Sequence, residues 1–179
     1  MNTQTNKEFY QNAMRNGTIL GAVWSIMYLL LFAGTTNMMS IFTCLILYFT
    51  SPFIAAKLAI KFRRNECENR MGYMQAWTFV FYMYICATLL SALVSYIYFR
   101  FFDEGAFFMS LQNMLNESMK IAGTDELMTQ QIKETQNIID NATTGSFVWQ
   151  IMNNNLVSST IMPLVIAIFV KNNDKQAKE

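Results

Sequence analysis

The sequence contains no histidine, and its 179 residues include only three cysteines and two prolines. Histidine is the commonest general base and the commonest metal ligand, so its absence removes the usual centre of acid–base and metal chemistry. Cys44, Cys67 and Cys86 are too far apart in sequence to form a CxxC metal or redox motif. The HExxH, GxSxG and phosphate-binding glycine motifs are also missing. We therefore expect a protein that is not an enzyme and that binds no cofactor and no metal.

Charged residues are also scarce. They make up 14% of the chain, whereas globular proteins average about 25%. Three long windows, 16–56, 71–99 and 141–170, have no charged residue at all. A membrane-spanning helix needs about 20 apolar residues, so the first window is long enough for two spans, and "GTTN" near its middle predicts a turn. The sequence thus predicts an all-α, integral membrane four-helix bundle with spans at about 17–33, 38–56, 74–99 and 147–170, which together form a single domain.

The basic residues indicate the orientation of these spans. Lysine and arginine are concentrated in the amino-terminal tail, in the connection between spans two and three, and in the carboxy-terminal tail. The connection between spans three and four carries seven acidic residues instead: Asp103, Glu104, Glu117, Asp125, Glu126, Glu134 and Asp140. Basic loops stay on the cytoplasmic side of a membrane. We expect a multi-pass protein of the cell inner (cytoplasmic) membrane, with both termini cytoplasmic and residues 100–146 outside.

The acidic insert, at about 103–145, is too long to be a simple turn, and its apolar residues recur at helical spacing. The first stripe comprises Phe108, Leu111, Leu115 and Ala122, and the second comprises Met128, Ile132, Thr135, Ile139 and Ala142. Gly123 is placed to end the first helix, and Thr124 to cap the second. These patterns predict an extracytoplasmic amphipathic helical hairpin between spans three and four.

Small residues recur every four positions in two of the spans. They are Gly17, Gly21 and Ser25 in the first span, and Ala87, Ser91 and Ser95 in the third. This spacing lets the backbones of two helices approach closely inside a membrane. The two faces are therefore candidates for helix packing, either within the bundle or between two copies of the chain.

Three consecutive asparagines, Asn153 to Asn155, lie inside the apolar fourth window. An unpaired amide is costly in hydrocarbon. Successive helical residues are about 100° apart, so the three side chains cannot share one partner. Asn155 and Ser159 are four residues apart, and we expect their face to point into the bundle and form hydrogen bonds between helices. The alternative is that Asn153, Asn154, Asn155 and Ser159 line a vestibule or path for a ligand.

A basic helical face follows the second span, with Lys57, Lys61 and Arg64 at helical spacing. Each such charge attracts anionic lipid headgroups. The patch is too small and too close to the membrane for nucleic-acid recognition. We therefore expect these three residues to contact the lipid bilayer and expect no nucleic-acid partner.

Several stretches of the chain resemble a known family. They are "NAMRNGTILGAV", "AAKLAIKFRRNECENRMGYMQAWTF", the acidic insert and "PLVIAIFVKNND", with Gly72, Tyr73, Ala76 and Trp77 as the most specific positions. Together they resemble the small four-span domain-of-unknown-function family numbered 4199, which is common in Bacteroidota. That family has no established activity, so the resemblance implies no catalytic or binding residues. Its members are often encoded near a membrane glycosyltransferase, which the resemblance implies as a candidate partner.

Taken together, these features predict a non-enzymatic inner-membrane protein that acts through association. It would be an accessory or scaffold subunit, using helix–helix contacts and the outer hairpin, with either a membrane protein partner or a second copy of itself. The alternative is a small-solute or lipid-handling membrane carrier. The four expected spans contain no Asp, Glu, Lys or Arg, so the usual intramembrane signature of ion-coupled transport is missing.

Overall fold

A computed structural model describes residues 3–34, 37–123 and 126–172. Within these residues the chain forms six helices and no strand, which confirms the all-α class. The helices are α1 (Thr3–Ala33), α2 (Met38–Glu66), α3 (Tyr73–Phe101), α4 (Ala106–Ala122), α5 (Glu126–Asp140) and α6 (Thr144–Val170).

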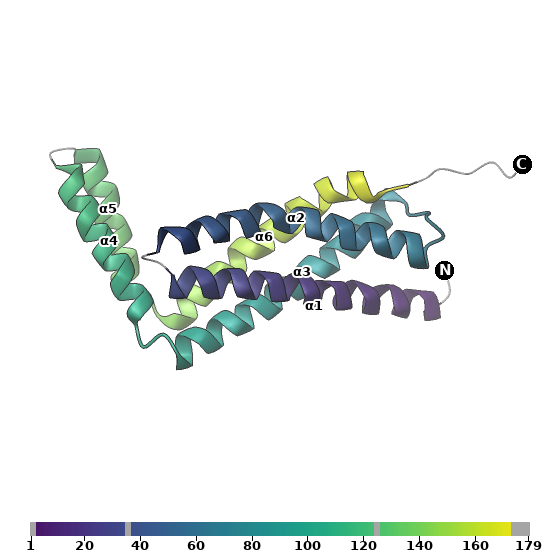
Figure 1. Ribbon diagram of the computed structural model, residues 1–179, viewed down its shortest axis with the longest axis horizontal. Helices are drawn as coiled ribbons and strands as arrows, with labels where there is room; N and C mark the ends of the chain where they lie inside the picture. Colours follow the sequence, from purple (N-terminus) through teal and green to yellow (C-terminus); the bar gives the residue numbers. More distant parts are fainter. Residues whose placement is uncertain (1–2, 35–36, 124–125, 173–179) are drawn as a thin grey trace, which may run out of the picture.

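The four long helices, α1, α2, α3 and α6, lie side by side as an elongated bundle (Figure 1). All four are long and apolar enough to cross a membrane. The shorter α4 and α5 stand together at one end of this bundle, which we call the hairpin end. Both chain termini lie at the opposite end, the termini end. A bundle of four membrane-spanning helices is therefore confirmed, with a helical hairpin between the third and fourth.

The helices extend beyond the apolar spans expected from the sequence. α1 begins at Thr3 rather than near Gly17, α2 continues past Ala56 to Glu66, and α6 begins at Thr144 rather than near Phe147. Leaving a lipid core does not end a helix, because the backbone hydrogen bonds are made within the segment in water as well. Capping residues set where a helix begins or ends. At the start of α2 the Asn37 side chain accepts a hydrogen bond from the Met39 amide. The expected turn residues Thr35 and Thr36 lie outside the described residues.

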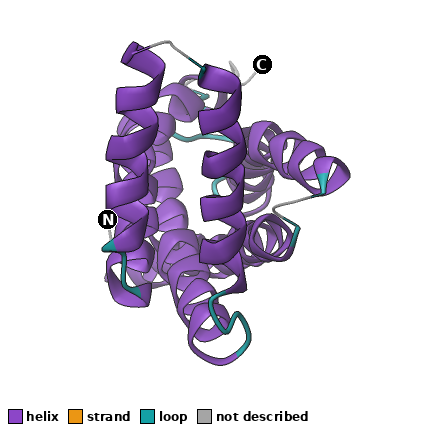
Figure 2. Ribbon diagram, turned by 90° about the vertical axis from the view of Figure 1, so that its left-hand side faces the viewer, coloured by secondary structure: helices purple, strands orange, loops and turns teal. Residues whose placement is uncertain are grey.

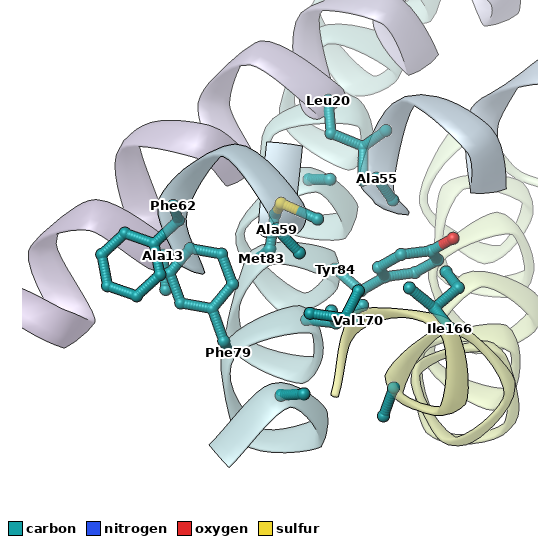
Figure 3. Close-up of a cluster of buried hydrophobic side chains, with 14 of the residues drawn as sticks. Ala13, Leu20, Ala55, Ala59, Phe62, Phe79, Met83, Tyr84, Ile166 and Val170 are labelled. Atoms are coloured by element: carbon teal, nitrogen blue, oxygen red, sulfur yellow. The ribbon is translucent and has the colours of Figure 1, made fainter. Parts of the chain in front are cut away.

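The core lies mainly where α3 packs on α1 and α6. Phe62 of α2 and Phe79 of α3 stack with ring centroids 4.2 Å apart, and Figure 3 shows the two rings face to face near Ala13. Several alanines are fully buried around them: Ala13, Ala55, Ala59, Ala76, Ala87 and Ala167. Small side chains at these positions allow the helices to approach closely.

A second cluster, the aromatic plug, closes the hairpin end of the bundle. We define it as Phe32, Phe99, Phe107 and Phe147, which come from α1, α3, α4 and α6. The Phe32 ring lies 4.5 Å from that of Phe99 and 5.4 Å from that of Phe107, centroid to centroid. The first three are buried. The plug therefore anchors the base of α4 to the bundle.

Beyond this base the hairpin stands off the bundle, and Figure 2 shows α4 and α5 running side by side. Asp103 is buried and accepts from the Phe107 amide at the start of α4. Gln112 donates to the Asp140 carboxylate at 2.8 Å and joins the two helices near their base. Gly123 follows α4 with a φ of 57°, as expected for a glycine that ends a helix. Thr124, the expected cap of the second helix, lies outside the described residues.

Candidate functional site

The small-residue face of α1 lies against α3 of the same chain. A Cβ atom at Gly17 would be 2.6 Å from the Met83 carbonyl oxygen and 2.7 Å from the Cys86 Cβ. At Gly21 it would be 3.0 Å from the Ala87 Cα. Real side chains do not tolerate the Gly17 distances, so α1 and α3 approach closely because these positions lack a Cβ. This face packs inside the bundle and is covered in the single chain.

The other small residues on the two faces are also buried. Ser25 donates to the Gly21 carbonyl oxygen at 2.7 Å, and Ser91 donates to the Thr88 carbonyl oxygen at 3.0 Å. Ser95 is fully buried, and its hydroxyl has no partner within the described residues. The hydroxyls of Ser25 and Ser91 are thus satisfied by their own helices, and they leave the contact surface smooth enough for close packing.

The three asparagines of α6 have different surroundings. Asn154 is exposed on the flank of the bundle, while Asn153 and Asn155 are half-buried. The Tyr28 hydroxyl of α1 donates to the Asn155 Oδ1 at 2.9 Å. The Asn155 Nδ2 is buried and has no partner within the described residues. Asn155 therefore faces the bundle, and only half of its amide is satisfied there.

A polar contact continues one turn further along α6. The Ser159 hydroxyl donates to the Asn155 carbonyl oxygen at 2.6 Å and lies 3.2 Å from the Thr88 hydroxyl of α3. Ser159 and Thr88 are both fully buried. Tyr28 and Thr88 were not predicted from the sequence as partners of Asn155 and Ser159. Both lie next to the small-residue faces, and this position is the signal that could have identified them.

A cavity of about 90 Å³ lies beside Asn155, among α1, α2, α3 and α6. The residues that line it are Trp24, Met27, Tyr28, Tyr48, Phe49, Ser51, Pro52, Tyr84, Asn155, Ser158 and Met162. The Trp24 indole nitrogen donates to the Ser51 hydroxyl at 2.6 Å. Tyr84, whose hydroxyl is visible in Figure 3, lines the same cavity. Trp24 and Ser51 are thus paired with each other, whereas the Asn155 Nδ2 is a buried donor without a partner within the described residues.

The lining of the cavity is most exposed on its α2 side. Tyr48 and Phe49 are 53% and 67% exposed, whereas Trp24, Ser51 and Tyr84 are all under 10%. Pro52 lies between these groups, and it has no backbone N–H to donate to the Tyr48 carbonyl. The mouth of the cavity is thus on the flank of α2, the side that faces lipid when the bundle spans a membrane.

The basic residues of α2 lie at the termini end of the bundle. Lys57, Lys61 and Arg64 are all exposed, and they are on the helix that extends past the expected second span. Their neighbour Arg63, which was not predicted as a functional residue, is half-buried. Its guanidinium donates to the Val170 carbonyl oxygen at 2.5 Å and to that of Lys171 at 3.4 Å. Arg63 therefore caps the end of α6, where a helix leaves carbonyl groups unpaired and a cation is favourable.

Replacing Tyr28 by phenylalanine tests the hydrogen bond between α1 and α6. Tyr28→Phe removes the one donor that the described residues offer to the Asn155 Oδ1, and it leaves the ring in place. Hydrogen bonds between membrane helices contribute about 0.6 kcal/mol and at most about 1.7 kcal/mol, so we expect a loss of stability in that range. Thermal unfolding in detergent measures it, with Tyr48→Phe as the exposed control. An unchanged midpoint for Tyr28→Phe would contradict this contact.

The sequence matches the family described as "Protein of unknown function (DUF4199)" over residues 15–172. This match covers α1 from Arg15 onward and all of the other five helices. The chain belongs to this family. No curated protein and no solved structure matches the chain.

The positions that most resemble the DUF4199 family lie where α3 begins. The Tyr73 hydroxyl donates to the Leu164 carbonyl oxygen of α6 at 3.2 Å, and Ala76 is fully buried. Trp77 stacks on Phe81 with centroids 5.4 Å apart. Tyr73 thus joins α3 to α6, and Ala76 packs in the core, so this segment has a packing role.

Proposed function

We propose that this protein is a non-enzymatic accessory subunit of a complex in the cell inner membrane, and that the α4–α5 hairpin binds its partner. The observation that carries the proposal is the exposure of apolar side chains on the hairpin. Ile121, Leu127 and Ile138 are 84%, 76% and 71% exposed. None of the α5 residues is buried. Helices of 15 to 17 residues are marginal alone in water and need an apolar face to be covered.

Charge favours a protein partner over a lipid surface. The segment 103–146 carries seven acidic residues and only two basic ones, Lys120 and Lys133. Helices that lie on anionic membranes are rich in lysine and arginine, because the headgroups repel acidic side chains. A membrane protein with a basic outer surface fits the hairpin better. A membrane glycosyltransferase is one candidate, and a second copy of this chain, with the same acidic hairpin, is a weaker one.

Co-purification tests this proposal. The double variant Leu127→Asn/Ile138→Asn makes the exposed apolar surface polar and leaves the base of the hairpin intact. We expect a stoichiometric partner that co-purifies with the unmodified protein in mild detergent to be lost from this variant. The matched control, Gln130→Asn/Asn137→Gln, changes exposed polar residues of the same helix and should retain the partner. Equal recovery from both variants would exclude the hairpin as the binding surface, and purification without any partner would overturn the accessory role.

The proposal requires the hairpin to be outside the cell membrane and the termini to be cytoplasmic. Glu126→Cys, at an exposed position of α5, should therefore react with an impermeant maleimide in intact cells, and Cys67 should react only after lysis. Burial, together with the Glu66 carboxylate, raises the pKa of the Cys67 thiol. Its thiolate forms at a higher pH than usual, so the lysed control is labelled under alkaline conditions. Labelling of Cys67 in intact cells, with Glu126→Cys protected, would reverse the orientation.

A carrier for a small solute or a lipid is the second candidate, because the Asn155 amide faces a cavity inside the bundle. The aromatic plug closes that cavity from the hairpin end, and the core around Phe62 and Phe79 closes it from the termini end. Transport would require the cavity to open alternately toward the hairpin end and toward the termini end of the bundle. Loss of solute uptake on Asn155→Leu, with retention of the partner, would favour the carrier.

A further inference from the structure

The cavity beside Asn155 presents a hydrogen-bond donor that no described residue satisfies. Tyr28 occupies the Oδ1 of this amide, and the Nδ2 is buried without a partner. Native proteins retain few buried polar atoms without partners, because leaving a buried donor unpaired is unfavourable. Asn155 also lines the cavity, so a molecule bound there could supply the missing acceptor.

The lining of the cavity defines the charge of that molecule. Its polar groups are the hydroxyls of Tyr28, Tyr48, Ser51, Tyr84 and Ser158 and the Asn155 amide, with the Trp24 indole already bonded to Ser51. The lining contains no lysine, arginine, aspartate or glutamate. A carboxylate or phosphate buried here would lack a counter-charge, which is strongly unfavourable. The acceptor is therefore neutral, and a carbonyl oxygen has the right chemistry for an amide N–H donor.

The position of the cavity mouth indicates whether the molecule enters from lipid or from water. The most exposed residues of the lining are Tyr48 and Phe49 of α2, and along the bundle the cavity lies between two buried clusters, one around Phe32 and Phe99 and the other around Phe62 and Phe79. The residues of α2 next to this mouth are also exposed and apolar, with Leu45 and Phe53 at 50% and 69% exposure. In a membrane this flank contacts acyl chains. The molecule thus enters from lipid rather than from water.

The size of the cavity limits how much of the molecule it holds. A cavity of about 90 Å³ is smaller than the roughly 150 Å³ cavity that accommodates a benzene molecule in a protein core. It has room for one functional group, and the rest of the molecule lies outside along α2. We propose that this cavity binds the carbonyl group of a neutral lipid-phase molecule, with the Asn155 Nδ2 donating the hydrogen bond. This site is independent of the proposed hairpin partner.

Two kinds of lipid-phase molecule carry such a carbonyl: acyl esters and quinones. The test adds methyl oleate, decylubiquinone or 1-octadecene to the detergent-solubilised protein at equal mole fractions and follows the midpoint of thermal unfolding. A ligand that binds only the folded state raises this midpoint. Octadecene has the chain length of the ester's acyl group but no oxygen, so it reports any non-specific effect of the hydrocarbon.

We expect the ester, the quinone or both to raise the midpoint of the unmodified protein, and octadecene to leave it unchanged. The ester alone would identify an acyl lipid, and the quinone alone a quinone. Asn155→Leu should need about five- to tenfold more of the active probe for the same shift, because it lacks one hydrogen bond. Asn154→Leu, a matched change at the exposed neighbour, should respond like the unmodified protein.

A second variant tests the site without changing the amide. Ser158→Phe places a ring in the cavity and should abolish the shift that the active probe causes, and it decides the question if Asn155→Leu does not fold. Three results would overturn the proposal: no probe shifts the midpoint, octadecene shifts it as much as the carbonyl compounds, or the shift is the same in the cavity variants. The first would mean that water alone satisfies the Asn155 Nδ2. Partner recovery in the hairpin experiment should be the same for Ser158→Phe and the unmodified protein, so the two proposals fail separately.

Discussion

Gly17→Leu is expected to destabilise the bundle by about 3 kcal/mol, near the upper limit for overpacking a close-packed interior. Even a Cβ atom at this position would lie 2.6 Å from the Met83 carbonyl oxygen. That atom belongs to the backbone of α3, so no change of side-chain rotamer can relieve the contact. The two helices have to separate, and the buried contacts around Leu20 and Ala87 would be lost with them. Thermal unfolding in detergent measures the effect.

Ala22→Leu is the matched control for this prediction. Ala22 is exposed on the opposite face of α1, so a leucine there extends toward the surroundings of the bundle. We expect a change of about 0.5 kcal/mol or less. If Gly17→Leu were as stable as Ala22→Leu, the close approach of α1 and α3 at this position would be wrong.

Phe32→Ala is expected to have the largest effect of any truncation at the hairpin end. Phe32 is 3% exposed, and its ring contacts those of Phe99, Phe107 and Phe147. Removing a buried phenylalanine side chain costs about 3–5 kcal/mol in close-packed cores. Because the aromatic plug holds the base of α4, the loss should also loosen the hairpin. We expect a lower unfolding midpoint and faster hydrogen exchange at the Phe107 amide, which bonds to Asp103 in the intact protein.

Phe101→Ala serves as the control for the aromatic plug. Phe101 lies two residues from Phe99 at the end of α3, but it is 71% exposed. Its truncation should change stability by about 1 kcal/mol or less and leave the Phe107 amide protected. Faster exchange in both variants would show that the hairpin is not anchored through the plug.

The two candidate functional features, the hairpin surface and the cavity, differ in how far apart in the chain their residues lie. The hairpin surface rests on exposed apolar residues within two consecutive helices, Ile121 in α4 and Leu127 and Ile138 in α5. The cavity rests on groups from four helices, with Tyr28, Ser51, Tyr84 and Asn155 far apart in the chain. A hairpin partner and a lipid-phase ligand are compatible, because the cavity mouth lies on the flank of α2 and the hairpin stands at the end of the bundle.

The sequence alone determined the number and the type of the helices. An uncharged apolar window of 29 residues or more is long enough for a membrane-spanning helix, which pairs its backbone polar groups within the segment. The same local logic predicted the amphipathic hairpin, the glycine that ends α4 and the inward position of Asn155. Each of these depends on residues within one or two helical turns of each other.

Only the tertiary structure decided which faces meet. The spacing of Gly17 and Gly21 is equally suited to a second copy of the chain, and only the packing of α1 on α3 shows that the face is covered internally. The pairing of Tyr28 with Asn155 joins residues 127 positions apart, and Arg63 reaches the end of α6 from 107 positions away. Periodicity gives the direction of a side chain around its own helix, but it does not give the rotation and crossing of the neighbouring helix. Those depend on the packing of the whole bundle.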